Sequence, residues 1–187
     1  MLYQHFLKIT PAFALLTEQQ ALEFDRIAKV YQRVYNYLID GWGKHVQSKP
    51  QVITVEHAAT FLKTKVKNLL SFAPWIAEEE RSMAFCAMFD ALRAVMDAYN
   101  SDGSCPSARA VGEKKVVFYK QYDVKLRLNQ AMLPFLGIVK TTRFAYFEGS
   151  IRGVGIEKTA GAWACNVYYV DNRTLEKERA EKETAAA

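Results

Sequence analysis

Long hydrophobic runs are missing from this sequence of 187 residues. No apolar stretch approaches the roughly 20 residues that a membrane-spanning helix needs, and the opening MLYQHFLKI is too short and too polar for a secretory signal. A disulfide framework is not indicated either, because the three cysteines are far apart, odd in number and outside any CxxC pair. We therefore expect a cytoplasmic protein, in a reducing compartment, that makes no contact with a membrane.

Patterns that carry catalytic chemistry are also scarce. His5, His45 and His57 form neither an HxxxH nor an HExxH motif, so packing or surface roles are expected rather than metal binding. The acidic run Glu78–Glu80 is explained by the favourable position of carboxylates in the first turn of a helix. RGVGIE lacks the strand–turn–helix context of a phosphate-binding loop. We expect no metal, no cofactor and no enzymatic activity in this chain.

Positive charge is concentrated in one part of the chain. Residues 1–110 carry 12 Lys and Arg against 11 Asp and Glu, whereas residues 111–170 carry nine against four. The net charge of +5 therefore comes from that third quarter, which also contains several aromatic residues. Such a segment attracts phosphate backbones, although lysines on the solvated faces of ordinary strands would look the same.

Apolar periodicity predicts a strand followed by helices. Alternation in residues 1–9 predicts a strand with Pro11 just beyond it. Thr17 and Gln20 then form a capping box, after which apolar residues recur at three- and four-residue intervals. This pattern predicts a helix that runs to about Asp40 and is ended by the GWG that follows.

Two more helices and a series of strands complete the predicted order. Helices are expected from Thr54 and from Glu78, the second ended by NSDGS. The next segments have strand composition, and TAG is a short hairpin loop between the last two. These segments are KVVFYK, YDVKLRL, FLGIVK, GSIRGVGIEKT and AWACNVYYV.

The order of these elements predicts an α+β fold. The N-terminal strand cannot be stable alone, so its partners must be the later strands. We therefore expect a small antiparallel β-barrel made by residues 1–12 and 111–171. Residues 13–110 would form a three-helix insertion into that barrel, and residues 172–187 a charged, solvated tail.

Nucleic-acid binding is the best supported chemistry among these patterns. Basic residues neutralise phosphates, and aromatic rings stack on unpaired bases, each stack contributing about 1–3 kcal/mol. Among the aromatic residues Phe118, Tyr119, Tyr122 and Tyr146, core packing is as plausible for each as a contact with a base. The candidate RNA-binding residues are Lys114, Lys115, Lys120, Tyr122, Lys125, Arg127, Lys140, Arg143 and Arg152.

A second candidate site lies on the predicted helices. Lys63 and Lys67 lie one turn apart on the second helix, so they could straddle a duplex backbone or enter a groove. Such a pair is also common on any solvated helix. The first helix carries Tyr35-Asn36-Tyr37 within an apolar run, although Asn competes for backbone hydrogen bonds and is a mediocre helix former.

Several short segments, in order, resemble the TnpB family of RNA-guided nucleases from insertion sequences, which are related to type V CRISPR effectors. They span roughly residues 3–170. The segments are YQHFLKITP, the VYN of the first helix, FLKTKVKNLL, LLSFAPWI, SMAFCAMFDALRAVMDAY, VKLRLNQAMLPFLGIVK and GSIRGVGIEKTAGAWACNVYYV.

The resemblance implies specific roles. In that family the strands form a wedge-type barrel that holds the guide RNA, and the helices form a recognition lobe beside the guide–target duplex. Tyr35 and Asn36 match the helix signature, while Lys63 and Lys67 lie on the helix that approaches a short DNA motif. A packing role for Asn36, with its amide bonded to backbone, is the alternative to a direct contact.

The sequence also departs from the family. The strand AWACNVYYV is soon followed there by GIDxG, which brings the first carboxylate of a RuvC-type nuclease, whereas here Asp171 is followed by NRTLEKER. The other nuclease carboxylates and the zinc-binding CxxC pairs are absent from this sequence, and two-metal cleavage needs those carboxylates. We therefore expect a chain that does not cut nucleic acid by itself.

Two functions follow as hypotheses. The first is a nuclease-less, TnpB-like protein that binds a structured guide RNA and assists recognition of double-stranded DNA. Its partner would be a separate RuvC-type nuclease subunit or a second copy of itself, and an exposed apolar surface is expected where that partner docks. The second is a protein-interaction module, an inhibitor or assembly factor, that keeps the fold without binding RNA. Convergence of the strand cations on one face would favour the first.

Overall fold

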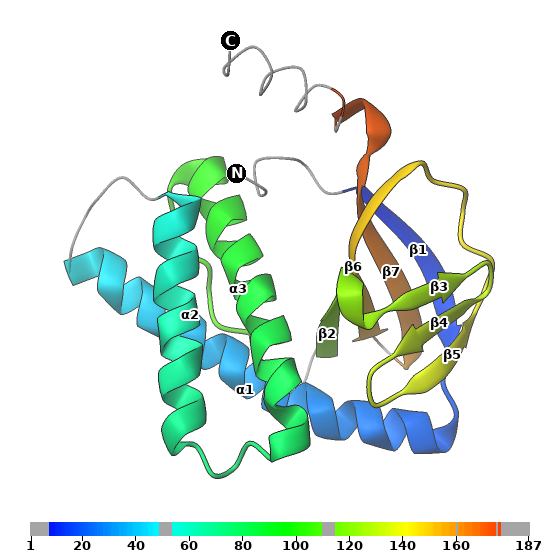
Figure 1. Ribbon diagram of the computed structural model, residues 1–187, viewed down its shortest axis with the longest axis horizontal. Helices are drawn as coiled ribbons and strands as arrows, with labels where there is room; N and C mark the ends of the chain where they lie inside the picture. Colours follow the sequence, from blue (N-terminus) through cyan, green and yellow to red (C-terminus); the bar gives the residue numbers. More distant parts are fainter. Residues whose placement is uncertain (1–7, 49–53, 110–114, 160, 175, 177–187) are drawn as a thin grey trace.

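The computed structural model describes residues 8–48, 54–109, 115–159, 161–174 and 176 (Figure 1). The protein is a mixed α+β protein with an antiparallel sheet, as the sequence predicts. Its elements, in chain order, are β1 (Lys8–Leu15), α1 (Glu18–Ser48), α2 (Val55–Phe72), the 3₁₀ helix η1 (Glu78–Glu80), α3 (Arg81–Asp102), β2 (Lys115–Lys120), the 3₁₀ helix η2 (Gln121–Asp123), β3 (Lys125–Arg127), β4 (Gln130–Leu133), β5 (Gly137–Thr141), β6 (Gly149–Thr159) and β7 (Ala162–Asp171).

Within the described residues, seven strands form one sheet in the order β2-β6-β7-β1-β5-β4-β3, which curls into a half-barrel (Figure 1). β1 lies inside this order. It pairs with β7 along Lys8–Phe13 and with β5 at Ala14 and Leu15, antiparallel in both cases. The expectation that the N-terminal strand pairs with late strands is therefore confirmed. The division into a barrel and a three-helix insertion stays a prediction.

The start of α1 is fixed by the capping box that the sequence predicts. The Thr17 amide donates to the Gln20 side chain at 3.0 Å, and the Gln20 amide donates to the Thr17 hydroxyl at 3.2 Å. The Gln20 side-chain amide also donates to the backbone oxygens of Leu136 and Ile138, at 2.8 and 2.9 Å. The cap thus fastens α1 to the start of β5.

α1 links the interior of the sheet to the other helices. Figure 1 shows its first half across one end of the curled sheet and its second half against α2 and α3. Near the sheet, the ring of Phe24 meets Trp163 of β7 edge to face, with centroids 4.9 Å apart. Buried residues of the sheet and of all these helices form one continuous apolar cluster. Burial of that surface is the main driving force for this arrangement.

β1 differs from the prediction because it contains Pro11 instead of ending before it. The Phe13 amide donates to the Thr142 hydroxyl at 3.0 Å, and the Thr142 amide donates to the Phe13 oxygen at 2.8 Å, so the polar groups of Phe13 point toward β5. Backbone groups two residues apart in a strand point to the same side, so the nitrogen of Pro11 points there too. Pairing with β5 begins only at Ala14, and the missing N–H of Pro11 therefore breaks no ladder bond.

α1 is also longer than predicted, because it continues through the GWG to Ser48. A glycine inside a helix costs about 1 kcal/mol relative to alanine. Trp42, between the two glycines, is only 1% exposed and packs on the rings of His45, His57 and Phe61. Burial of this large side chain offsets the cost of the glycines and extends the helix.

The remaining differences are local. Residues 130–133, which lie between the predicted strand segments YDVKLRL and FLGIVK, form β4, which pairs with β3 and β5. The first tail residues form a helical turn whose Thr174 amide donates to Asp171 at 2.8 Å. Residues 177–187, and with them most of the predicted solvated tail, lie outside the described residues.

Candidate nucleic-acid interface

The solvent-facing side of β3, β4, β5 and the end of β1 brings several predicted residues together. Along these strands alternate side chains are buried, such as those of Ala131, Leu133 and Val139, and the side chains between them face solvent. We call this surface the outer face and define it by the side chains that point outward. They are Phe13, Leu15, Lys125, Arg127, Gln130, Met132, Ile138 and Lys140.

The strand register fixes the spacing of the cations on the outer face. Arg127 pairs with Gln130, which pairs with Lys140, and Lys140 pairs with Leu15. Neighbouring strands lie about 4.8 Å apart, so the backbones at Arg127 and Lys140 are about 10 Å apart. Lys125 lies two residues from Arg127 on the same strand. These three cations therefore form a compact triangle.

Within the described residues, the cations of this region have no acidic partner. Lys125, Arg127, Lys140 and the nearby Arg143 are all exposed. Among the described residues, none of the four takes part in an ion pair or a side-chain hydrogen bond, and β3, β4 and β5 carry no acidic residue. Uncompensated cations on one face produce a positive potential that attracts phosphates.

Apolar side chains lie between these cations. Phe13 is 68% exposed and Leu15 64%, and Met132 and Ile138 pair directly across β4 and β5 with about half of their surface exposed. Such a group of exposed apolar residues on one face marks an interaction surface. The exposed apolar surface that the sequence analysis expects is therefore present, while the partner that would cover it stays a prediction.

Other predicted RNA-binding residues lie elsewhere. Lys120 of β2 is half-buried, with its ammonium 5.2 Å from the centre of the Phe89 ring in α3. Arg152 of β6 is half-buried, and its Nε has no hydrogen-bond partner among the described residues. Both strands are separated from β5 by β7 and β1 in the sheet. Lys114 lies outside the described residues, as does the side chain of Lys115.

The aromatic candidates divide into two kinds. Tyr119 is fully buried and Phe118 nearly so, and both belong to the core. Tyr122 in η2 is 89% exposed and lies just before β3 in the chain, and Tyr146 is 86% exposed in the β5–β6 loop. Only the two exposed rings can stack on a base without a change in the fold.

Tyr35 and Asn36 both contact the same residue, Arg109, which lies in the segment after α3. The Asn36 amide donates to the Arg109 oxygen at 3.0 Å, and the Arg109 amide donates to the Asn36 side-chain oxygen at 2.9 Å. The Arg109 guanidinium lies over the buried Tyr35 ring, 3.8 Å from its centre. Both ends of the Asn36 amide are thus satisfied by backbone, which supports the packing role over direct contact with nucleic acid.

Asp90, which is not among the residues predicted from the sequence, is the centre of this buried cluster. Its carboxylate, in α3, accepts hydrogen bonds from the Tyr31 hydroxyl at 2.9 Å and from Arg93 and Arg109, each at 2.7 Å. Burial alone would raise the pKa of Asp90, but the charges of Arg109 and Arg93 and these hydrogen bonds lower it below its ordinary range. Burial also raises the pKa of Tyr31 well above its usual value. The cluster is a charged anchor between α1, α3 and the chain that leads to β2.

Lys63 and Lys67 are exposed on α2, away from the outer face. The histidines have packing contacts: Nε2 of His45 lies 3.0 Å from Nε2 of His57, and the His45 ring stacks on Phe61 at 4.4 Å. His5 lies outside the described residues. In the part of the chain that the structure describes, no three metal-binding side chains gather into a cation site.

Comparison with known proteins leaves the family open. No protein-family model matches this chain, and no curated protein matches it significantly. None of the helices within the described residues is both long enough and apolar enough to cross a membrane.

Proposed function

We propose that this chain binds structured RNA through the outer face. The observation that supports this most directly is the group formed by Lys125, Arg127, Lys140 and Arg143, which are exposed and have no acidic partner among the described residues. A protein that keeps four cations together without counter-ions gains affinity for a polyanion, because bound phosphates release the counter-ions condensed on the nucleic acid.

The same face offers contacts beyond charge. Phosphates of one RNA backbone would follow the line from Arg127 to Lys140, and unpaired bases would pack on Phe13 and Tyr122, whose rings are exposed. The aliphatic side chains between them would cover ribose and base surface. Recognition of this kind depends on shape and on single-stranded segments more than on sequence.

In the fuller form of this proposal the chain is a nuclease-less, TnpB-like protein. The RNA is then a guide, a RuvC-type nuclease subunit or a second copy completes the complex, and Lys63 and Lys67 on α2 contact double-stranded DNA beside the target. The exposed apolar residues of the outer face and the exposed lysine pair on α2 are compatible with these roles.

Two measurements test RNA binding. The chain is purified from its host with and without ribonuclease treatment, and the RNA that accompanies it is sequenced. The affinity for the enriched RNA is then measured by fluorescence anisotropy at several salt concentrations. Replacing Lys125 and Lys140 by Glu should lower the affinity at least tenfold and reduce the salt dependence, since each lost phosphate contact lowers the slope by about 0.7–0.9.

A matched control carries the same charge change elsewhere. Lys29 and Lys44 are exposed on α1, so the Lys29→Glu/Lys44→Glu variant has the same net charge and leaves the outer face intact. We expect its affinity to fall by less than about threefold, through the long-range field alone. Equal losses in the two variants, or no RNA above background, would overturn the proposal.

A second function is favoured by the exposed apolar side chains of the outer face. A protein partner rather than RNA would use Leu15, Met132 and Ile138 as the centre of its interface, with the cations at the rim. Replacing Leu15 and Ile138 by Ser would then make the complex dissociate. Where the partner is a second copy of the chain, size-exclusion chromatography with light scattering shows this as a change from dimer to monomer mass. Two results together would contradict the protein-docking function: the chain is monomeric with and without these substitutions, and the variant keeps its RNA affinity.

A further inference from the structure

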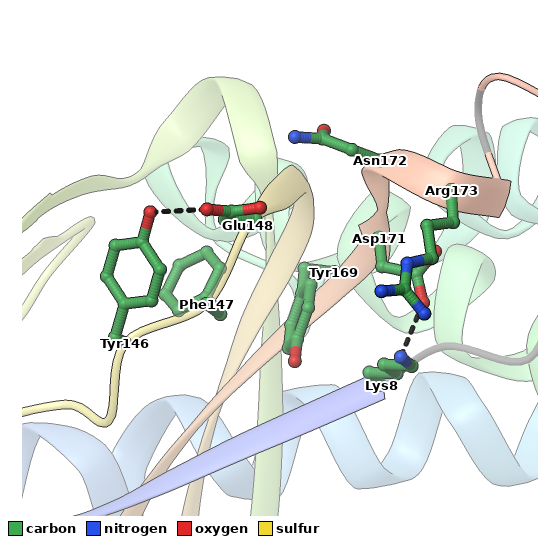
Figure 2. A pocket seen from close by; sticks show the side chains of 8 residues that line it. All are labelled: Lys8, Tyr146, Phe147, Glu148, Tyr169, Asp171, Asn172 and Arg173. Atoms are coloured by element: carbon green, nitrogen blue, oxygen red, sulfur yellow. Dashed lines mark hydrogen bonds and ion pairs between the residues drawn. The ribbon is translucent and has the colours of Figure 1, made fainter.

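A pocket of about 300 Å³ opens at one rim of the half-barrel. Its walls come from the start of β1, the end of β7 and the loop between β5 and β6 (Figure 2). Lys8 and Tyr169 pair across β1 and β7 at this rim, and α1 lies across the opposite end of the sheet (Figure 1). Mouths of barrels are common positions for ligand sites, and this volume is at the small end of their range, suited to one small molecule.

One wall of this rim pocket is aromatic. The rings of Phe147 and Tyr169 pack together with centroids 4.7 Å apart and planes inclined by 35°. Tyr146 lies beside them with most of its ring in solvent, and its hydroxyl donates to the Glu148 carboxylate at 2.7 Å. That hydrogen bond raises the pKa of Tyr146, so the ring remains a neutral phenol. A fixed, exposed ring beside an aromatic pair is a platform for stacking.

Charge is distributed unevenly around the rim pocket. Lys8 forms an ion pair with Asp171, and Asp171 also accepts the Thr174 amide, so these two groups compensate each other. Arg173 is exposed and makes no hydrogen bond or ion pair within the described residues. Figure 2 shows Arg173 and Glu148 on opposite sides of Tyr169. Within the described residues, the pocket therefore presents a cation without an acidic partner at one side and a carboxylate at the other.

The carboxylate of Glu148 keeps hydrogen-bonding capacity. An ionised carboxylate has about four lone-pair sites, and the Tyr146 hydroxyl occupies one of them. It can accept a hydrogen bond from an amino group on a planar ring, as acidic side chains do from the amino groups of bases. A ligand that satisfies all three features has an aromatic ring, an amino group on that ring and an anionic group at its other end.

We propose that the rim pocket binds one nucleotide with an amino-bearing base, which is adenine, cytosine or guanine. The base stacks on the aromatic wall, its amino group donates to Glu148, and its phosphate contacts Arg173. A free nucleotide and one nucleotide of an RNA strand have this same chemistry. The site is separate from the outer face and does not depend on it.

The test is a titration of the full chain with AMP, UMP and adenosine, in which the affinity for each ligand is measured by isothermal titration calorimetry. AMP should bind more tightly than UMP by about three- to tenfold, because UMP has no amino group to donate. Adenosine, which has no phosphate, should also bind more weakly, and its deficit relative to AMP should shrink at high salt. Tyr146→Ala should weaken AMP binding by about fivefold to a hundredfold through the lost stacking.

Phe72→Ala is the matched control, because Phe72 is also an exposed aromatic residue but lies at the end of α2, outside the pocket and the outer face. It should leave AMP affinity unchanged. Glu148→Ala, which removes the acceptor, should remove the preference for AMP over UMP while the thermal midpoint of unfolding stays the same. Both replaced side chains are exposed, so the variants should fold.

A second arm separates the two sources of the nucleotide. Short oligoadenylate is titrated beside AMP: if only the strand binds, and Tyr146→Ala weakens it, the nucleotide belongs to RNA. The Lys125→Glu/Lys140→Glu variant must keep its AMP affinity, which separates failure of the RNA-binding proposal from failure of this one. The rim-pocket proposal is overturned if neither ligand depends on Tyr146, or if Phe72→Ala has the same effect.

Discussion

The cluster around Asp90 and the outer face contain the same kinds of cations in opposite situations. Arg93 and Arg109 are mostly buried, share one carboxylate and lie over the Tyr168 and Tyr35 rings. The cations of the outer face are exposed and have no acidic partner among the described residues.

This difference separates a structural use of charge from an available one. A buried ion pair that loses one member leaves an uncompensated charge in a region of low polarity, which is strongly destabilising. An exposed cation without a partner contributes little to stability, and its field remains available to a ligand. Substitutions in the first region should therefore change stability and leave binding intact, and those in the second should do the reverse.

The largest effect is expected from Asp90→Asn. The variant keeps the shape of the side chain but leaves two guanidinium groups without their shared counter-charge, and it should lower the free energy of unfolding by about 3–5 kcal/mol. Urea denaturation measures this. Asp97→Asn is the control, because Asp97 is exposed and its contact with Arg93 is long, at 3.9 Å, so a change within about 0.5 kcal/mol is expected. Equal effects would contradict the anchoring role.

Acid should weaken the same anchor by a smaller amount. The pKa of Asp90 in the folded chain lies below its ordinary value of 3.8. A lowered pKa contributes stability that is complete above the unfolded-state value and is lost as the pH falls through the folded-state value. The free energy of unfolding should therefore decrease below about pH 4, and it should decrease less in Asp90→Asn, which cannot titrate there. Parallel pH profiles of the two chains would show that Asp90 is not the group responsible.

Asn36→Ala should have an intermediate effect. It removes both hydrogen bonds that hold the backbone of Arg109, and leaving these groups unsatisfied costs about 1–3 kcal/mol. Asn68→Ala, at an exposed position of α2, is the control and should change stability by less than about 0.5 kcal/mol. RNA and DNA affinities, measured where both variants are fully folded, should not change. A loss of affinity without a loss of stability would instead support direct contact by Asn36.

Local features of the fold could be predicted from the sequence, because neighbouring residues carry them. The capping box of Thr17 and Gln20 needs only a three-residue spacing, and Phe24 and Leu38 show the apolar period of α1 directly. The continuation of α1 past its glycines could not be predicted in this way, because it depends on how Trp42 packs against α2.

The two charged regions were predictable to different degrees. Each cation of the outer face is visible in the sequence, but only the strand register places Lys125 and Lys140 on one face and Lys120 elsewhere. Asp90 has the spacing of an ordinary surface pair with Arg93, and its second partner, Arg109, comes from beyond the end of α3. Long-range pairing of this kind leaves no local pattern.

The smallest effect on stability is expected on the outer face. Lys125→Gln/Lys140→Gln removes two exposed charges that have no acidic partner within the described residues, and it relieves repulsion among like charges. The free energy of unfolding should stay within about 0.5 kcal/mol of the parent chain or rise slightly, whereas RNA affinity and its salt dependence should both decrease. Both are measured on one preparation, by urea denaturation and by anisotropy. A marked loss of stability would mean that these lysines, like Arg93 and Arg109, are needed to hold the fold, and the distinction between the two regions would fail.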